Sequence, residues 1–143
     1  MKDLDLTAMT DEQIVRHNTE LLVRAGQQRT VNASNALLLE AKVFGDALVA
    51  RGPETLRKLL PLLNHENCHV QVAAAVRCYK IGHEECSALL WEQAQAHSPA
   101  SSGASLFLLG EDPAYREFLT KETDKSLGGT WWQERFSEWQ PKK

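Results

Sequence analysis

Two absences and an odd cysteine count narrow the classes of function that this sequence can serve. It has no basic excess, since 16 basic residues face 19 acidic ones, whereas nucleic-acid and anionic-membrane binders usually carry one. No hydrophobic run approaches the roughly 18 residues that a membrane-spanning helix needs. The three cysteines are an odd number, and free thiols in a chain without a signal indicate a reducing cytosol. We therefore expect no nucleic-acid or membrane partner.

The N-terminus also lacks the pattern of a secretory signal. The stretch MKDLDLTAMTDEQ interrupts its apolar residues with charges and holds no continuous hydrophobic core. We expect a cytoplasmic protein. Its 143 residues suit one domain, residues 1–143, that buries roughly 68% of its unfolded surface without covalent staples.

Motifs for catalysis are missing as well. The chain has no glycine-rich phosphate loop, no nucleophile elbow, and no paired histidine ligands with a glutamate base. The serine-rich residues 98–105 have the composition of a loop or a loose helix start, with no base placed beside them. We expect neither an enzyme nor a bound cofactor.

What is present is helical periodicity. Apolar residues recur every three or four positions and never alternate over a useful length, which predicts helices and no strands. The first helix has a capping box, with Thr10 as the cap and Gln13 three residues later, and Gly26 is placed to end it. His17 and Asn18 fall on its apolar side, so both are predicted to be buried and hydrogen-bonded.

Further helices follow along the chain. Pro61 interrupts the third one and predicts a kink or an early end, because proline removes a helical hydrogen bond. The predicted ranges are about 30–51, 53–63, 70–81, 84–97 and 102–109. Glycines that end helices recur at Gly52, Gly82 and Gly110, which are 30 and 28 residues apart. A period near 30 with two helices per unit is typical of a helical solenoid.

The segment NHENCHVQVAAAVRCYKIGHEEC, residues 64–86, holds all three cysteines and three of the five histidines. Cys68 and Cys78 lie ten residues apart, roughly 15 Å along one helix, so they cannot share an ion. A structural zinc takes four ligands, and each end of the segment offers only three. We expect no metal site. The two groups are His65, Cys68 and His69, and Cys78, His83 and Cys86.

The same segment resembles a known repeat. VQVAAAVRCYKIG is similar to the second helix of a HEAT repeat of the phycobilisome-lyase type, V-R-x-x-A-A-x-x-L-x-x-I-G. Cys78 takes the leucine position and Cys86 a later alanine position, where cysteine serves as a small hydrophobe. Gln71 departs from the pattern, which has arginine there. The matching residues are Val70, Ala74, Ala75, Ile81 and Gly82.

Residues 11–120 as a whole are similar to a small bacterial HEAT/armadillo-like family of unknown function. The likeness rests on feature order, with a long second helix ending ALVARG before LRKLLPLLNHENCHVQVAAA. It implies an all-α superhelix of about six to seven helices, with HEAT-like pairs over 11–125. Residues 126–143 would form a tryptophan-rich C-terminal cap or tail.

Two places offer candidate binding residues. On the predicted helix 70–81, Val72, Val76 and Tyr79 either pack on the adjacent repeat or form a contact surface. They lie off the predicted core stripe of this helix, which consists of Val70, Ala73, Ala74, Cys78 and Ile81. The C-terminal tryptophans either cap the last repeat, bind a partner, or insert at a membrane surface. The candidate partner-binding residues are Gln71, Tyr79, Lys80, Trp91, Trp131, Trp132 and Trp139.

The expected function is that of a non-catalytic protein-binding module, since fold alone implies no activity. Small acidic helical-repeat proteins of bacteria resemble immunity proteins, which neutralise a cognate toxin by direct binding. Two alternatives stay open: a HEAT-like nucleic-acid repair enzyme, and a lyase-like chaperone for a chromophore. The oligomeric state is left open.

Overall fold

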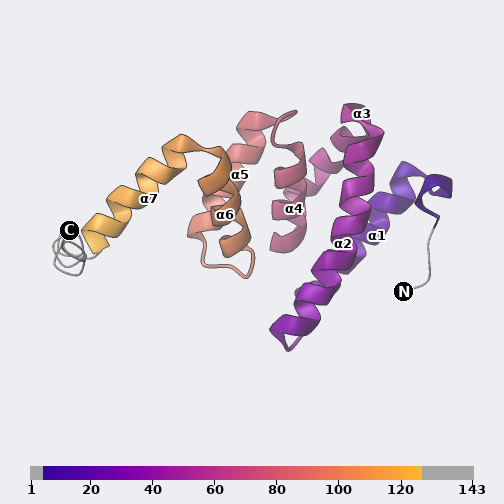
Figure 1. The fold of residues 1–143 in the computed structure, drawn as a ribbon, viewed down its shortest axis with the longest axis horizontal. Helices are drawn as coiled ribbons and strands as arrows, with labels where there is room; N and C mark the ends of the chain where they lie inside the picture. The colour runs from indigo at the N-terminus through magenta and orange to yellow at the C-terminus, as the bar shows by residue number, and fades with distance from the viewer. Residues whose placement is uncertain (1–4, 127–143) are drawn as a thin grey trace, which may run out of the picture. The chain divides into compact units, whose positions relative to one another are not determined.

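The computed structural model describes residues 5–126, and this part of the chain contains helices and no strand (Figure 1). The prediction of an all-α protein is therefore confirmed. The elements are η1 (Leu6–Ala8), α1 (Asp11–Ala25), α2 (Val31–Arg51), α3 (Pro53–Leu56), η2 (Arg57–Asn64), α4 (Cys68–Cys78), α5 (His83–Gln95), α6 (Ser101–Glu111) and α7 (Pro113–Ser126), where η marks a 3₁₀ helix.

The chain divides into two compact units, Met1–Ser105 and Leu106–Lys143. The second unit, described up to residue 126, holds the end of α6 and all of α7. Leu108 and Tyr115 are buried there, and Arg116 Nη1 donates to the carbonyl oxygen of Leu109 at 2.7 Å. The single domain over residues 1–143 stays a prediction. No helix in residues 5–126 is long and apolar enough to cross a membrane.

Helix α1 begins at the predicted capping box. Thr10 Oγ1 accepts a hydrogen bond from the Gln13 amide at 3.1 Å, and Gln13 Oε1 accepts one from the Thr10 amide at 2.9 Å. These two bonds satisfy amides that a helix start leaves without an intrahelical partner. The helix ends at Ala25, and the Gly26 amide donates to Leu22.

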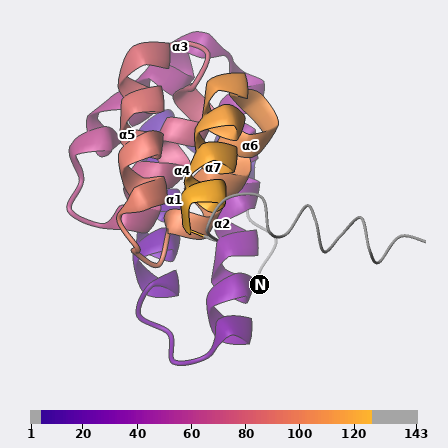
Figure 2. The ribbon, with the colours of Figure 1, turned by 90° about the vertical axis from the view of Figure 1, so that its left-hand side faces the viewer.

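Helices α1 and α2 pack side by side as a hairpin, and the end with their connecting loop extends past the other helices of the first unit (Figures 1 and 2). Asn18 is buried, and its Nδ2 donates to the carbonyl oxygen of Ala41 at 2.7 Å. The predicted burial and hydrogen bonding of Asn18 are confirmed. The predicted burial of His17 is wrong, because its ring lies against Phe44 with a centroid distance of 5.4 Å and stays exposed.

The third helical segment changes type where proline was expected to disturb it. Its α-helical part ends at Leu56, and the backbone continues as the 3₁₀ helix η2, which contains Pro61. A 3₁₀ helix bonds residues three apart and suits short, proline-bearing stretches. The predicted early end of the third α-helix is confirmed. Gly52 joins α2 to this segment with φ of 110°, a conformation that favours glycine.

Helix α4 begins two residues before the predicted start, because Asn67 caps it. Asn67 Oδ1 accepts hydrogen bonds from the amides of His69 and Val70 at 2.9 and 3.3 Å. On the predicted core stripe, Ala73 and Ile81 are only half-buried, while Val70, Ala74 and Cys78 are buried. On the other stripe, Val72 and Tyr79 are buried as well.

The core of the first unit is apolar and lies where α1, α2, η2, α4 and α5 meet. Its largest fully buried side chains include Phe44, Ile14, Leu48, Leu59, Leu90, Val70, Cys78 and Cys86.

Candidate functional site

A groove of about 580 Å³ opens between η2, α4 and α5 in the first unit. Leucine and alanine side chains form its apolar part, and two carboxylates and two amides make it polar. The lining residues are Leu60, Leu63, Asn64, Gln71, Glu85, Ala88, Leu89 and Glu92.

One wall of the groove is a single face of α5. Glu85, Ala88, Leu89 and Glu92 are spaced i, i+3, i+4 and i+7, which places them on one side of a helix. Both glutamates are exposed and Leu89 is half-buried. Two helical turns separate the carboxylates, a rise of about 10 Å. This wall therefore presents a leucine between two negative charges.

The opposite wall comes from η2. Residues three apart eclipse one another in a 3₁₀ helix, so Leu60 and Leu63 lie on the same face. Leu63 is buried and Leu60 half-buried. Leu60 also packs over the α4–α5 turn, since a Cβ on Gly82 would lie 3.2 Å from Leu60 Cδ2. The unusual helix type created near Pro61 thus brings two leucines to the groove.

Gln71 links the elements around the groove. Its Nε2 donates to the carbonyl oxygen of Leu63 at 3.2 Å, and its Oε1 accepts from Gln93 Nε2 at 3.1 Å. These two bonds join α4 to η2 and to α5. The residue that departs from the arginine of the resembled repeat therefore serves as a neutral bridge in this chain.

The other predicted partner-binding residues lie elsewhere. Tyr79 is only 8% exposed, with its ring edge-on to His83 at 4.7 Å, so it has little surface to offer a partner. Lys80 is exposed and Trp91 half-buried, and neither lines the groove. Trp131, Trp132 and Trp139 lie outside the described residues. Sequence reasoning missed seven of the eight lining residues. The spacing of Glu85, Ala88, Leu89 and Glu92 does indicate that these four share one face of a helix.

The cysteines and histidines of residues 64–86 do not come together as ligands. In the described part of the chain, no three His, Cys, Asp or Glu side chains lie close enough to hold a metal ion. Cys78 and Cys86 are buried free thiols, and Cys78 Sγ donates to the carbonyl oxygen of Leu56 at 3.2 Å. Burial, with the nearby Cys86 sulfur, raises the pKa of Cys78 to about 12.

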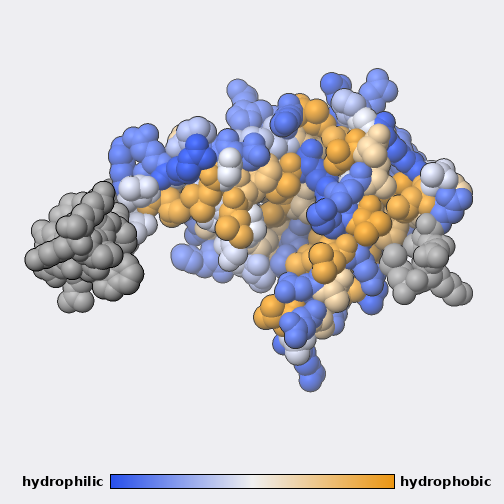
Figure 3. Space-filling view, in the orientation of Figure 1, coloured by the Kyte–Doolittle hydropathy of each residue, from blue (hydrophilic) through white to orange (hydrophobic). Residues whose placement is uncertain are grey.

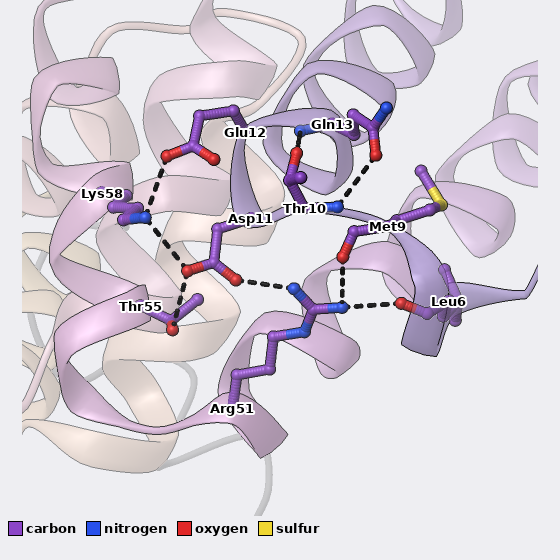
Figure 4. A network of polar contacts seen from close by, with 9 residues as sticks. All are labelled: Leu6, Met9, Thr10, Asp11, Glu12, Gln13, Arg51, Thr55 and Lys58. Atoms are coloured by element: carbon purple, nitrogen blue, oxygen red, sulfur yellow. Dashed lines mark hydrogen bonds and ion pairs between the residues drawn. The ribbon is translucent and has the colours of Figure 1, made fainter.

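A polar network joins the start of α1 to the end of α2 (Figure 4). Arg51 donates to Asp11 Oδ1 at 2.7 Å and to the carbonyl oxygens of Leu6 and Met9 at 2.6 and 2.7 Å. Lys58 reaches Asp11 Oδ2 at 3.1 Å. Bonds from Arg51 and then Lys58 lower the pKa of Asp11. These charges satisfy one another, so the network holds helices together.

Helix α2 carries a second surface feature. Hydrophobic residues lie among hydrophilic ones along this helix (Figure 3), and Val31 and Leu39 are 74% and 67% exposed. The ion pair of Lys42 with Asp46, at 2.8 Å, lies on the same exposed side. This surface mixes apolar side chains with charged ones, and none of its residues lines the groove.

No family model, curated protein or solved structure matches this chain. The groove is therefore interpreted from its own residues and charges.

Proposed function

We propose that this protein is a non-catalytic protein-binding module whose helices stack as HEAT-like pairs, with the groove of η2, α4 and α5 as its binding surface. The observation that carries this is the groove lining, which combines three leucines with two exposed carboxylates, one of the leucines lying between the carboxylates on α5. Interfaces commonly combine an apolar centre with a polar rim. Three leucines supply the centre, and Glu85 and Glu92 supply the rim.

The lining favours recognition over a reaction. It contains no serine, cysteine, histidine or lysine, and its two carboxylates are exposed and separated by about 10 Å of helical rise. Its amide Gln71 is engaged with neighbouring helices. A preformed surface of this kind binds with little change of shape.

The concrete form that we favour is a cytoplasmic immunity protein that neutralises a cognate bacterial toxin by covering its active surface. Its support is the small size and the acidic character of the chain, with a formal net charge of −3. An acidic rim attracts a basic partner and speeds its association. Toxins that act on nucleic acid present basic surfaces to their substrates.

The alternative of a nucleic-acid repair enzyme has less support. Several cations that such a protein would need in a groove are already paired with carboxylates. Arg51 and Lys58 pair with Asp11, and Arg77 pairs with Asp46 at 2.9 Å. The groove itself is lined by two acidic residues and no basic one.

Capture experiments with matched variants test the proposal. The full chain, tagged, is co-expressed with the product of the neighbouring gene and purified. We expect a stable complex that the double reversal Glu85→Lys/Glu92→Lys abolishes. The control is Glu20→Lys/Glu84→Lys, which makes the same charge change at exposed residues outside the groove.

The control residues match the test residues in their position within a helix. Glu84 shares the first turn of α5 with Glu85, and Glu20, like Glu92, lies inside a helix. Capture that both double variants keep would contradict the groove as the binding surface. Capture lost only on Leu39→Lys would place the partner on α2 instead.

A further inference from the structure

We infer that the segment bound in the groove is an amphipathic α-helix with two basic residues seven positions apart and an apolar residue between them. The inference rests on the proposed function and names the partner's chemistry. It follows from the spacing of the charges, the place of the leucines and the absence of cations beside Glu85 and Glu92.

The spacing sets the distance between the partner's charges. Glu85 and Glu92 are separated by two helical turns, about 10 Å of rise. On a partner helix, basic residues at i and i+7 have the same separation and share one face. Lysine or arginine side chains at those positions can therefore reach both carboxylates at once.

The apolar residue of the partner is placed by the leucines. Leu89 lies between the two glutamates on α5, and Leu60 and Leu63 face the groove from η2. An apolar side chain at i+3 or i+4 of the partner would lie between its two basic residues and contact these leucines. A helix laid in a groove uses this pattern of anchors.

A helix is favoured over an extended peptide because of the backbone around the groove. Extended peptides commonly bind by adding a strand to a sheet edge, and residues 5–126 contain no strand. The α5 wall bonds its own backbone groups internally. Side chains are therefore what this wall offers, and a partner helix is recognised through side chains alone.

The unpaired state of the two carboxylates is the third observation. In residues 5–126, Asp11, Glu12, Asp46 and Glu117 each form an ion pair with a basic residue, whereas exposed glutamates such as Glu20 and Glu84 form none. Within the same part of the chain, Glu85 and Glu92 form none. The helix dipole explains an acidic residue in the first turn of α5, where Glu85 lies. Glu92 lies two turns later, where its exposed carboxylate is open to a cation of a partner.

Designed peptides test the inference directly. The probe is an 18-residue helix-forming peptide with lysines at i and i+7 and leucine at i+4. One control moves the second lysine to i+5, which keeps the composition but takes the charge off the face. Another control replaces both lysines with glutamate. Calorimetry with the full chain measures affinity at two salt concentrations.

We expect the matched peptide to bind about threefold more tightly than the shifted one, which loses one of two exposed ion pairs, and about tenfold more tightly than a peptide that lacks both. Glu85→Gln/Glu92→Gln should remove this advantage and most of the salt dependence. Glu20→Gln/Glu84→Gln, with the same change of charge, should keep both. Far-ultraviolet circular dichroism checks that each variant is folded.

Three outcomes would overturn the inference. They are equal affinity for matched and shifted peptides, unchanged binding by Glu85→Gln/Glu92→Gln, and binding of spermidine as tight as that of the matched peptide. If the charge reversals abolish partner capture while no peptide binds, the helix inference fails and the protein-binding proposal stands. If partner capture is unchanged by Glu85→Lys/Glu92→Lys, the proposal of the groove as the protein-binding surface fails.

Discussion

At the scale of single residues, Cys78 shows how a chemically versatile side chain serves packing. Its sulfur is fully buried and donates to the carbonyl oxygen of Leu56. Burial disfavours the thiolate, which is the reactive form of cysteine. Cys86 is buried in the same way, and burial is the main cause that raises its pKa. Cys68, at the start of α4, is only half-buried.

We therefore predict unequal thiol reactivity. In the native protein at pH 8, Ellman's reagent should modify Cys68, while Cys78 and Cys86 should react at least a hundredfold more slowly, an order-of-magnitude expectation for buried thiols. All three should react in denaturant. The Cys68→Ser variant should show no fast phase, and two or more fast thiols in the native wild type would contradict the assignment.

At the scale of elements, a glycine inside α2 leaves room for a side chain of α4. Gly45 is buried, and a Cβ at this position would overlap the guanidinium of Arg77. Arg77 Nη1 donates from there to Asp46 Oδ1 at 2.9 Å. Glycine inside a helix is about 1 kcal/mol less favourable than alanine. The lower helix propensity of Gly45 is therefore offset by the space that it leaves for the Arg77 side chain.

A double-mutant cycle measures the coupling between Gly45 and Arg77. In the Arg77→Ala background, Gly45→Ala should raise the free energy of unfolding by about 1 kcal/mol, the helix-propensity difference. With Arg77 present, the gain should be smaller, because the new methyl group displaces the guanidinium from Asp46. Urea unfolding of the four proteins provides the values. Equal gains in both backgrounds would contradict the close approach.

The network at the start of α1 predicts a pH dependence. Arg51 and Lys58 lower the pKa of Asp11 below its usual value of 3.8. A lowered folded-state pKa contributes stability above pH 3.8 that is lost as the pH falls through the folded value. Arg51→Gln should therefore move the midpoint of acid unfolding, followed by circular dichroism, to higher pH. Arg57→Gln, at an exposed residue outside the network, should leave the midpoint unchanged.

At the scale of the whole molecule, stability depends on a small apolar core. Phe44 is 2% exposed, at the contact between α1 and α2, and His17 stacks over it. Phe44→Ala should lower the free energy of unfolding by about 3–5 kcal/mol through lost burial and a cavity. This is a large share of the roughly 5–15 kcal/mol typical of a domain.

The matched control is an apolar residue on the exposed side of the same helix. Leu39→Ala should change the free energy of unfolding by under about 0.5 kcal/mol, because the side chain is already in water. Thermal and urea unfolding of both variants checks the contrast. Equal losses for the two substitutions would contradict the orientation of α2.

The positions of most helices followed from the sequence by itself because their signals are local, whereas no range was predicted for α7. The capping box of Thr10 and Gln13, the turn at Gly52 and the break near Pro61 each act within a few residues. The start of α4 differs from the predicted one because the side chain of Asn67 caps the helix, a contact that apolar periodicity does not reveal. His17 was assigned to the core because its position matched the apolar stripe.

The groove depended on tertiary packing. Its walls come from η2 and α5, and Gln71 bridges them through bonds to Leu63 and Gln93, which no periodicity reveals. The packing of Tyr79 against His83 likewise depends on how the chain turns after α4. Local rules determine where helices begin and end, whereas contacts between distant residues determine which helix faces stay open to a partner.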